Sequence, residues 1–334
     1  MAISYSQTVD IRGQAVEPVI TEILFENKTV SDKLVSFETD IKAGTIFTET
    51  NQTVTMQAWT VNPSSAGAMT PSDVIITPVK LEYFQTYDTN DLRSSRFNRS
   101  MKPGAWNTIS DEFTKYVING VAGYIGADVE NKFWNNALAA TKTAVAALSP
   151  GTANNQVSTQ EQALVAATTA GLFDGIVTRL IYNNGGVGSR IKVAGATITS
   201  SNIATEYARQ YALIPDETLF AESGEKAYWY APRSHRKLIN ILNKAQTYRD
   251  IFTVDIAADK YYYLDIEIKF VPLSANTMIV ALPSMLKWCT DLMEDMNNVV
   301  VDAMPKPRKD YYYDVVFTLF AHVVNQRFIT LYVG

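Results

Sequence analysis

The sequence predicts an α+β protein with a long helix, a long β-hairpin and a compact α/β unit. Residues 108–137 place apolar side chains at helical spacing, which is typical of one long amphipathic helix. Within residues 41–88, Val54, Met56 and Ala58 alternate with Thr53, Thr55 and Gln57 in a period of two, which indicates a strand, and Gly, Pro and Ser gather near the middle of the segment. Shorter helical and strand patterns alternate from about residue 155 to residue 290, which indicates the α/β unit.

The composition is that of a globular protein with a sizeable core. Of the 334 residues, 47% are hydrophobic and 19% are charged. The net charge of −5 argues against a surface that holds nucleic acid by bulk electrostatics. Cys289 is the only cysteine, so no intrachain disulfide can form. The N-terminus lacks a basic start with an apolar core, and no apolar run is long enough to span a bilayer, so we expect neither a signal peptide nor a membrane partner.

The N-terminal part of the chain predicts an arm followed by the hairpin. Residues 1–40 show no strong period and predict an extended arm with at most a short helix. The hairpin tip is expected from Pro63 to Pro71, where the sequence is small, polar and turn-forming. Between residues 43 and 79 only Glu49 and Asp73 carry charge. An isolated two-stranded ribbon is marginal in water and exposes its edges, so we expect this hairpin to lie across another copy of the chain.

A basic run follows the hairpin. Arg93, Arg96, Arg99 and Lys102 recur every three residues, a pattern suited to phosphates or to carboxylates of a neighbouring subunit. A solvated face is the plain alternative. Because the chain is acidic overall, ion pairs with a neighbouring subunit are favoured over nucleic-acid contacts.

The long helix has clear start and stop signals. Thr108 or Ser110 can cap its first turn, and acidic residues at 111 and 112 suit the positive end of its dipole. A helix from 108 to 137 would be roughly 45 Å long at about 1.5 Å per residue. An Ala-, Thr- and Ser-rich stretch follows, and Pro150 with Gly151 marks a domain boundary.

The remaining elements are expected as follows. Ser200 or Ser201 is expected to cap the second helix of the α/β unit, and Ser234 to begin the third. Helices are expected at 161–183, 200–214 and 234–246, strands at 190–195, 226–232, 264–272 and 277–283, a turn at 185–189, and tail strands at 298–304, 311–324 and 326–333.

No residue pattern favours catalysis, a metal or a cofactor. Cys289 with His235 or His322 shows no catalytic-cysteine signature, so structural roles are favoured for all three. Metal-binding and nucleotide-binding motifs are absent from the sequence. Asp265 and Glu267 could share a strand face, which leaves a carboxylate-dependent hydrolase or lyase as the least favoured interpretation. The tyrosine triplets at 261–263 and 311–313 more often serve packing than base stacking.

The order of these parts resembles the major capsid proteins of tailed phages, of the Hong Kong 97 type. The resemblance is carried by "TISDEFTKYVINGVAGYIGADVENKFWNNA", which is similar to the family's spine helix, and by "AYWYAPRSHRKLINILNKA" and "DIEIKFVPLSANTMIVALPSMLKWCTDL", which are similar to its axial domain. The resemblance implies an N-terminal arm (1–40), an extended hairpin loop (41–88), a peripheral domain with a spine helix (89–154 and 291–334) and an axial domain (155–290). It also implies that the tail returns to the peripheral sheet.

The resemblance further implies a structural shell protein without enzymatic activity. Such a protein would assemble into pentamers and hexamers and form an icosahedral head around double-stranded DNA, in the cytoplasm of the host bacterium. Separate scaffolding and portal proteins are the expected partners, with weak contacts to the DNA. An encapsulin-like nanocompartment shell is the alternative. The expected inter-subunit contacts are the hairpin residues Trp59, Pro63, Ala66, Met69 and Pro71, and the ion-pairing residues Arg93, Arg96, Arg99 and Lys102.

Overall fold

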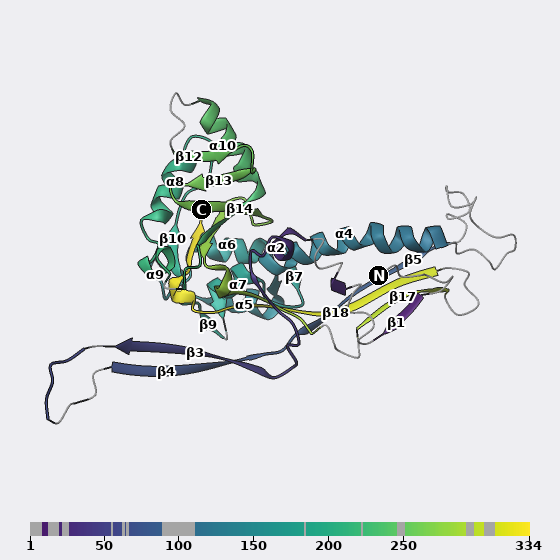
Figure 1. Cartoon of the computed structure of the whole chain (residues 1–334), viewed down its shortest axis with the longest axis horizontal. Coiled ribbons are helices and arrows are strands. Elements are labelled where there is room, and N and C mark those ends of the chain that lie inside the picture. The colour runs from purple at the N-terminus through teal and green to yellow at the C-terminus, as the bar shows by residue number, and fades with distance from the viewer. Residues whose placement is uncertain are drawn as a thin grey trace, which may run out of the picture.

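A computed structural model of the whole chain shows two β-sheets flanked by helices and a hairpin that projects from them (Figure 1). The α/β unit stands above one end of the molecule, and the long helix runs over an elongated sheet toward the other end. The structure describes residues 9–12, 20–21, 27–54, 56–61, 64, 67–88, 111–183, 185–221, 223–245, 251–291, 297–303 and 311–334.

The projecting hairpin consists of β3 (Thr45–Val54) and β4 (Gly67–Ile76). The two strands pair in antiparallel register from Thr45 opposite Ile76 to Val54 opposite Gly67. The predicted tip was too long, because residues 67–71 belong to β4 and Pro71 lies opposite Thr50. A two-stranded ribbon tolerates proline there, since each strand has an outer edge that needs no hydrogen-bond donor.

The elongated sheet contains six strands and lies beneath the long helix. Its path runs β1, β17, β18, β16, β2, and β5 also pairs with β18. The segment predicted as one hairpin at 41–88 is therefore divided, because only β3 and β4 form the hairpin and residues 79–87 belong to this sheet. The short strand at 286–289 had not been predicted. The bounds are β1 (Val9–Arg12), β2 (Ser36–Glu38), β5 (Val79–Tyr87), β16 (Leu286–Cys289), β17 (Asn298–Ala303) and β18 (Tyr311–Val323).

The predicted long helix is present as α4 (Asp111–Asn135), and its expected caps at 108 and 110 lie outside the described residues. Its apolar stripe faces the core: Ile125, Val129 and Phe133 are buried. The Phe133 ring stacks on Trp288 of β16 with 4.4 Å between ring centroids, which fixes the helix to the six-stranded sheet.

The α/β unit contains a seven-stranded mixed sheet in the order β10, β19, β15, β11, β14, β13, β12. Tyr207 and Trp229 stack with their ring centroids 4.6 Å apart in its core. The strands are β10 (Ile191–Ala194), β11 (Tyr228–Pro232), β12 (Phe252–Asp255), β13 (Lys260–Tyr263), β14 (Ile266–Val271), β15 (Thr277–Ala281) and β19 (Thr330–Val333), and the helices are α8 (Ile203–Tyr211), α9 (Asp216–Leu219) and α10 (Arg233–Ala245).

The helix predicted at 161–183 was wrong in its length. The segment forms α6 (Thr159–Ala167) and α7 (Ile176–Ile181), and between them β7 (Ala170–Gly171) pairs with β6 (Ala137–Leu138) just after α4. A Cβ on Gly175 would lie 2.8 Å from the backbone nitrogen of Asn136 and from the carbonyl oxygens of Lys132 and Phe133, so glycine permits this close approach. The serines expected to cap α8 do not, because its N-cap residue is Asn202.

The tail divides between the two sheets, which corrects the expectation that it returns to one. Strands β17 and β18 belong to the six-stranded sheet, whereas β19 pairs with β10 and β15 in the other sheet. Asn325 has φ of 52° and turns the chain between them. The remaining elements are α2 (Lys28–Ser31), α5 (Ala139–Ala147), β8 (Tyr182–Asn183), β9 (Gly186–Val187), η3 (Pro283–Met285) and η4 (Gln326–Phe328).

Candidate functional site: the projecting hairpin and the pocket below α4

The root of the hairpin is packed into the body of the protein. Val74 is 6% exposed and Ile76 is fully buried. The Phe47 ring stacks on His322 of β18 with 5.6 Å between centroids, and the Lys287 ammonium lies 4.8 Å from the same Phe47 ring. These contacts at the root fix the orientation of the hairpin relative to the six-stranded sheet.

The outer face of the hairpin exposes apolar side chains. Ile46 lies opposite Ile75, and their exposed fractions are 57% and 65%. Met69 and Pro71 occupy alternate positions on β4, so they belong to the same face as Ile75, and both are exposed. Asp73 lies on the same face, and its carboxylate accepts a hydrogen bond from the Thr48 hydroxyl at 2.7 Å.

Beyond the last strand pair, apolar side chains extend into solvent. The exposed fractions of Met56, Trp59 and Val61 are 91%, 87% and 80%. Exposed apolar patches of this kind mark surfaces that contact another protein. Of the residues predicted to contact a neighbour, the structure therefore exposes Trp59, Met69 and Pro71; the remaining ones, Pro63, Ala66, Arg93, Arg96, Arg99 and Lys102, lie outside the described residues.

Cys289 is buried beside the hairpin root. Burial raises the pKa of its thiol to about 12, so the thiol stays protonated near neutral pH. His322 is buried on the neighbouring strand β18, where burial and the nearby Arg179 and Lys287 cations lower its pKa to about 4. A protonated thiol and a weakly basic imidazole are not an activated nucleophile and base, so packing accounts for both residues.

His235 lies in the other sheet region, on α10. Its Nδ1 is 3.1 Å from the Tyr207 hydroxyl, and its Nε2 is 2.9 Å from the carbonyl oxygen of Ala275. Burial lowers the pKa of His235 to about 4. Its two ring nitrogens are thus used to connect α8, α10 and the turn before β15.

The structure gives Asp265 and Glu267 different partners. Asp265 precedes β14 and accepts a hydrogen bond from the Tyr211 hydroxyl at 3.3 Å. Glu267 lies within β14 and forms an ion pair with Lys269 at 2.8 Å. Neither residue lines the pocket described next. Each carboxylate is satisfied locally, which is the arrangement of structural ion pairs and hydrogen bonds.

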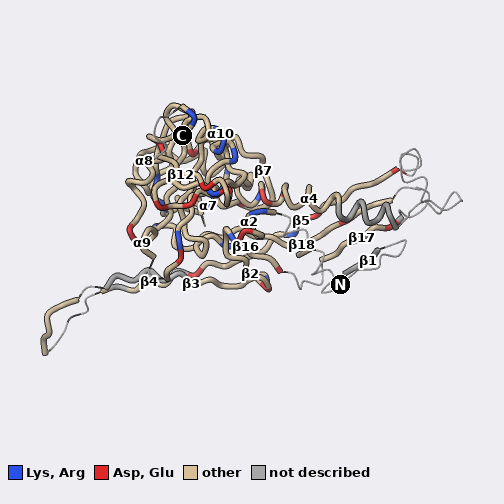
Figure 2. Tube along the Cα trace, turned by 45° about the horizontal axis from the view of Figure 1, so that its top comes forward, with Lys and Arg blue, Asp and Glu red and all other residues tan. Residues whose placement is uncertain are grey.

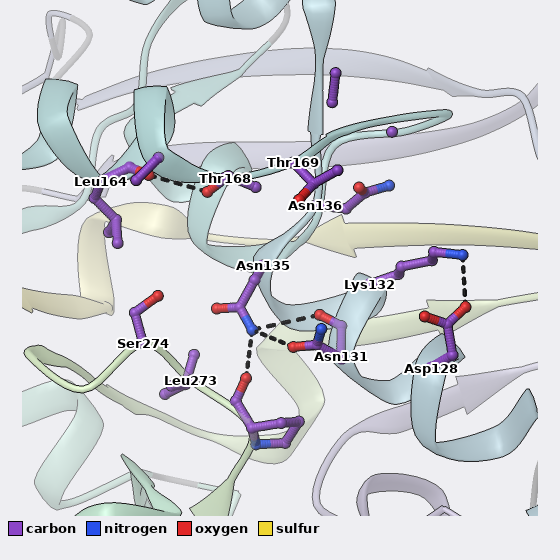
Figure 3. Close-up of a pocket in the computed structure, with 14 residues that line it drawn as sticks. Asp128, Asn131, Lys132, Asn135, Asn136, Leu164, Thr168, Thr169, Leu273 and Ser274 are labelled. Atoms are coloured by element: carbon purple, nitrogen blue, oxygen red, sulfur yellow. Dashed lines mark hydrogen bonds and ion pairs between the residues drawn. The ribbon is translucent and has the colours of Figure 1, made fainter. Parts of the chain in front are cut away.

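A pocket of about 540 Å³ lies where the end of α4 meets the α6–α7 connection and the turn after β14 (Figure 3). Asn135 points into this junction and donates hydrogen bonds to the Pro272 carbonyl and to Asn131 Oδ1. Lys132 and Asp128 form an ion pair at 2.5 Å along the same helix. The hydrogen bond from Asn135 to the Pro272 carbonyl therefore connects the end of the long helix to the α/β unit at this pocket.

Across the described ranges, no cluster of three or more His, Cys, Asp or Glu side chains is arranged to hold a metal ion. None of the helices in the same ranges combines the length and hydrophobicity of a membrane span.

Comparisons with known proteins identify the fold. No family model and no curated protein matches the sequence. The procapsid of satellite phage P4 with its size determination protein matches at 10% identity and TM-score 0.52, covering 95% of this chain and 98% of that chain. The capsid of the native GTA particle matches at 10% identity and TM-score 0.54 (99% and 94%), and the structure of Gordonia phage Cozz at 8% and 0.51 (100% and 91%). The chain has the Hong Kong 97-like fold of phage capsid proteins, as its element order indicated.

Proposed function

We propose that this protein is the major capsid protein of a tailed phage. The observation that carries the proposal is the projecting hairpin: its root is buried against the six-stranded sheet, while its outer face and end expose apolar side chains over a long ribbon. The likeness of the fold to assembled phage shells supports the same conclusion. The proposed role is structural and non-enzymatic.

In the proposed shell, each copy lays its hairpin across a neighbouring copy. Burial of apolar surface stabilises such contacts by about 25 cal/mol per Å², so some hundreds of Å² contribute several kcal/mol before ordering costs. Heterologous contacts repeated around an axis close into rings, here pentamers and hexamers. Many weak contacts then hold a closed container through multivalency.

We propose for each segment of the chain the role that the resemblance implied. Residues 1–40 form the arm, 41–88 the extended hairpin, 89–154 with 291–334 the peripheral domain, and 155–290 the axial domain. The last strand β19 reinforces the axial sheet although it belongs to the C-terminal segment. We propose that the shell encloses double-stranded DNA, that separate scaffolding and portal proteins assist its assembly in the host bacterial cytoplasm, and that the protein resides in the virion capsid.

The test compares the full chain with a chain whose hairpin is shortened. Replacing residues 50–71 by an Asn-Gly turn closes the ribbon after the Glu49–Ser72 pair and leaves the buried root in place. We expect rings or closed shells from the full chain in negative-stain electron microscopy and size-exclusion chromatography. The shortened chain should remain folded, with the circular dichroism of the full chain, and form no shells.

The outcomes separate the alternatives. Closed shells formed by the shortened chain would contradict the role given to the hairpin. A full chain that stays monomeric at high concentration, with and without its phage's scaffolding protein, would contradict the capsid proposal. Particles that enclose nuclease-protected DNA support a phage head, whereas particles that enclose a protein cargo support a nanocompartment instead.

A further inference from the structure

Two oppositely charged surfaces lie at opposite ends of the seven-stranded sheet. Helix α10 packs on β11 and β14 in the half of the sheet that ends at β12, where Asn243 Nδ2 donates a hydrogen bond to the Phe252 carbonyl at 3.3 Å. Helix α9 packs near the other end of the sheet, formed by β10 and β19, where the Thr218 hydroxyl donates to the carbonyl of Phe328, in η4 just before β19, at 2.6 Å. Figures 1 and 2 show α9 on one side of the α/β unit and α10 on the other.

The surface at α10 is basic, and we call it the α10 face. The sequence from 233 to 245 contains four Lys or Arg residues and no acidic residue. Its two arginines pair within the chain, but neither Lys237 nor Lys244 has an ion pair among the residues that the structure describes. Ile241 lies between these lysines at spacings of four and three residues, so the three share one side of the helix, and Ile241 is 54% exposed.

The surface at α9 is acidic, and we call it the α9 face. Asp216 and Glu217 occupy the first turn of α9 and are exposed. Neither carboxylate forms an ion pair within the described part of the chain. Two large apolar side chains flank them: Leu213 is 47% exposed and Phe220 is 74% exposed.

We propose that the α10 face of one copy docks on the α9 face of the next copy. This inference rests on the proposed shell function and names one contact that would close its rings. Each face presents two unpaired charges of one sign beside exposed apolar side chains, and the two signs are opposite. Because the faces lie at opposite ends of one sheet, the contact is head-to-tail, which is the type that closes into rings.

The chemistry favours a second copy over nucleic acid as the partner. A DNA duplex would satisfy Lys237 and Lys244, but it would leave Ile241 and the whole α9 face uncovered. A neighbouring α9 face covers both the charges and the apolar side chains. Exposed ion pairs each contribute only about 0.2–1 kcal/mol, so these pairs would set orientation while the apolar contact adds affinity.

The test uses reciprocal charge reversal in the full chain. The α10 variant carries Lys237→Glu with Lys244→Glu, and the α9 variant carries Asp216→Lys with Glu217→Lys. Each variant alone should need roughly tenfold more protein to form rings, because like charges then face each other. The chain with all four substitutions should recover ring formation. A matched control, Lys28→Glu with Lys33→Glu, makes the same charge change on exposed lysines elsewhere and should assemble as the unmodified chain does.

Mixing the two variants provides a sharper result. The α10 variant has two acidic faces and the α9 variant has two basic faces, so at the protein concentration that the unmodified chain needs, each variant binds the other in preference to itself. A ring in which they alternate must contain an even number of copies. Native mass spectrometry of the equimolar mixture should therefore show six-membered rings and no five-membered rings.

Three results would overturn the contact. The first is ring formation by both variants at the concentration that the unmodified chain needs. The second is a four-substitution chain with unchanged circular dichroism that still forms no rings. The third is normal assembly of the α10 variant combined with loss of binding to a 30-base-pair DNA duplex, which would assign the α10 face to nucleic acid. If the unmodified chain forms no rings at all, the proposed function fails first and this contact with it.

Discussion

Arg190 and Glu161 form a fully buried ion pair, with 2.5 Å between Nη2 and Oε1. The other carboxylate oxygen of Glu161 accepts a hydrogen bond from the Ser158 backbone nitrogen at 2.7 Å. The guanidinium also donates to the Gly188 carbonyl at 3.0 Å. One pair thus joins the start of α6 to the loop after β9 and to the start of β10. In a shell protein, this network would hold the α/β unit rigid while its outer surfaces make contacts.

We predict that Glu161→Ala strongly destabilises the protein. The substitution leaves the buried Arg190 charge without its partner, which costs roughly 3–5 kcal/mol of the free energy of unfolding. Urea denaturation followed by tryptophan fluorescence measures this cost. The control is Asp259→Asn, which breaks the exposed pair with Arg236 and should cost less than about 1 kcal/mol. An equal loss in the free energy of unfolding for the two variants would contradict the stabilising role proposed for the buried pair.

Acid should weaken the fold through its two buried histidines. Burial lowers the pKa of His322 and of His235 to about 4. The unfolded chain, with histidine pKa near 6.5, binds protons first as the pH falls, so the histidine contribution to stability does not change above pH 6.5 and becomes unfavourable between pH 6.5 and pH 4. Each histidine should therefore cost about 2 kcal/mol between pH 7 and pH 5. Unfolding measured at both pH values should show a smaller loss for His322→Gln than for the unmodified chain, and an unchanged loss would contradict the assignment.

Phe47→Ala should loosen the hairpin without unfolding the body. The ring of Phe47 is held by the His322 stack and the Lys287 cation, and its removal takes away both contacts at the root. Hydrogen exchange in β3 and β4 should become at least about tenfold faster, corresponding to about 1.4 kcal/mol, while exchange in α10 should not change. Ile46→Ala is the matched control, because Ile46 directly precedes Phe47 and its side chain faces solvent. Equal exchange rates in the two variants would contradict the root contact.

Trp59→Ser with Met69→Ser should separate folding from assembly. Both side chains are exposed, 87% and 64%, so their removal should change the free energy of unfolding by no more than about 0.5 kcal/mol. If the hairpin contacts a neighbour, the same change should reduce shell formation by tenfold or more in light scattering. Tyr124→Ser is the control: its side chain is 80% exposed on α4 and lies away from the hairpin. Normal assembly of the hairpin variant would remove these two residues from the contact.

Local patterns in the sequence predicted much of this fold. The apolar spacing of Ile125, Val129 and Phe133 predicted a long helix with one buried side, and the structure confirms it. Alternating side chains also predicted strands, because side-chain periodicity indicates which face of an element is buried. The near absence of charge in the hairpin predicted that its surface contacts another protein. Met69 lies between Ala68 and Thr70, but Ile75 lies between Val74 and Ile76, so local alternation could not show that Ile75 is the exposed residue of these three.

Only the tertiary structure decided how these elements combine. Glu161 and Arg190 are separated along the chain, and no local pattern shows that they meet as a buried pair. The same holds for Phe47 and His322, which stack on each other although their strands belong to different sheets. Likewise, the apolar residues of β19 predict a buried strand but not its partners. The turn at Asn325 directs β19 away from β18, and β19 then pairs with β10 and β15. The sequence by itself determined the type of each long element through local periodicity, whereas pairing between distant elements depended on which buried surfaces and unpaired backbone edges the folded chain brought together.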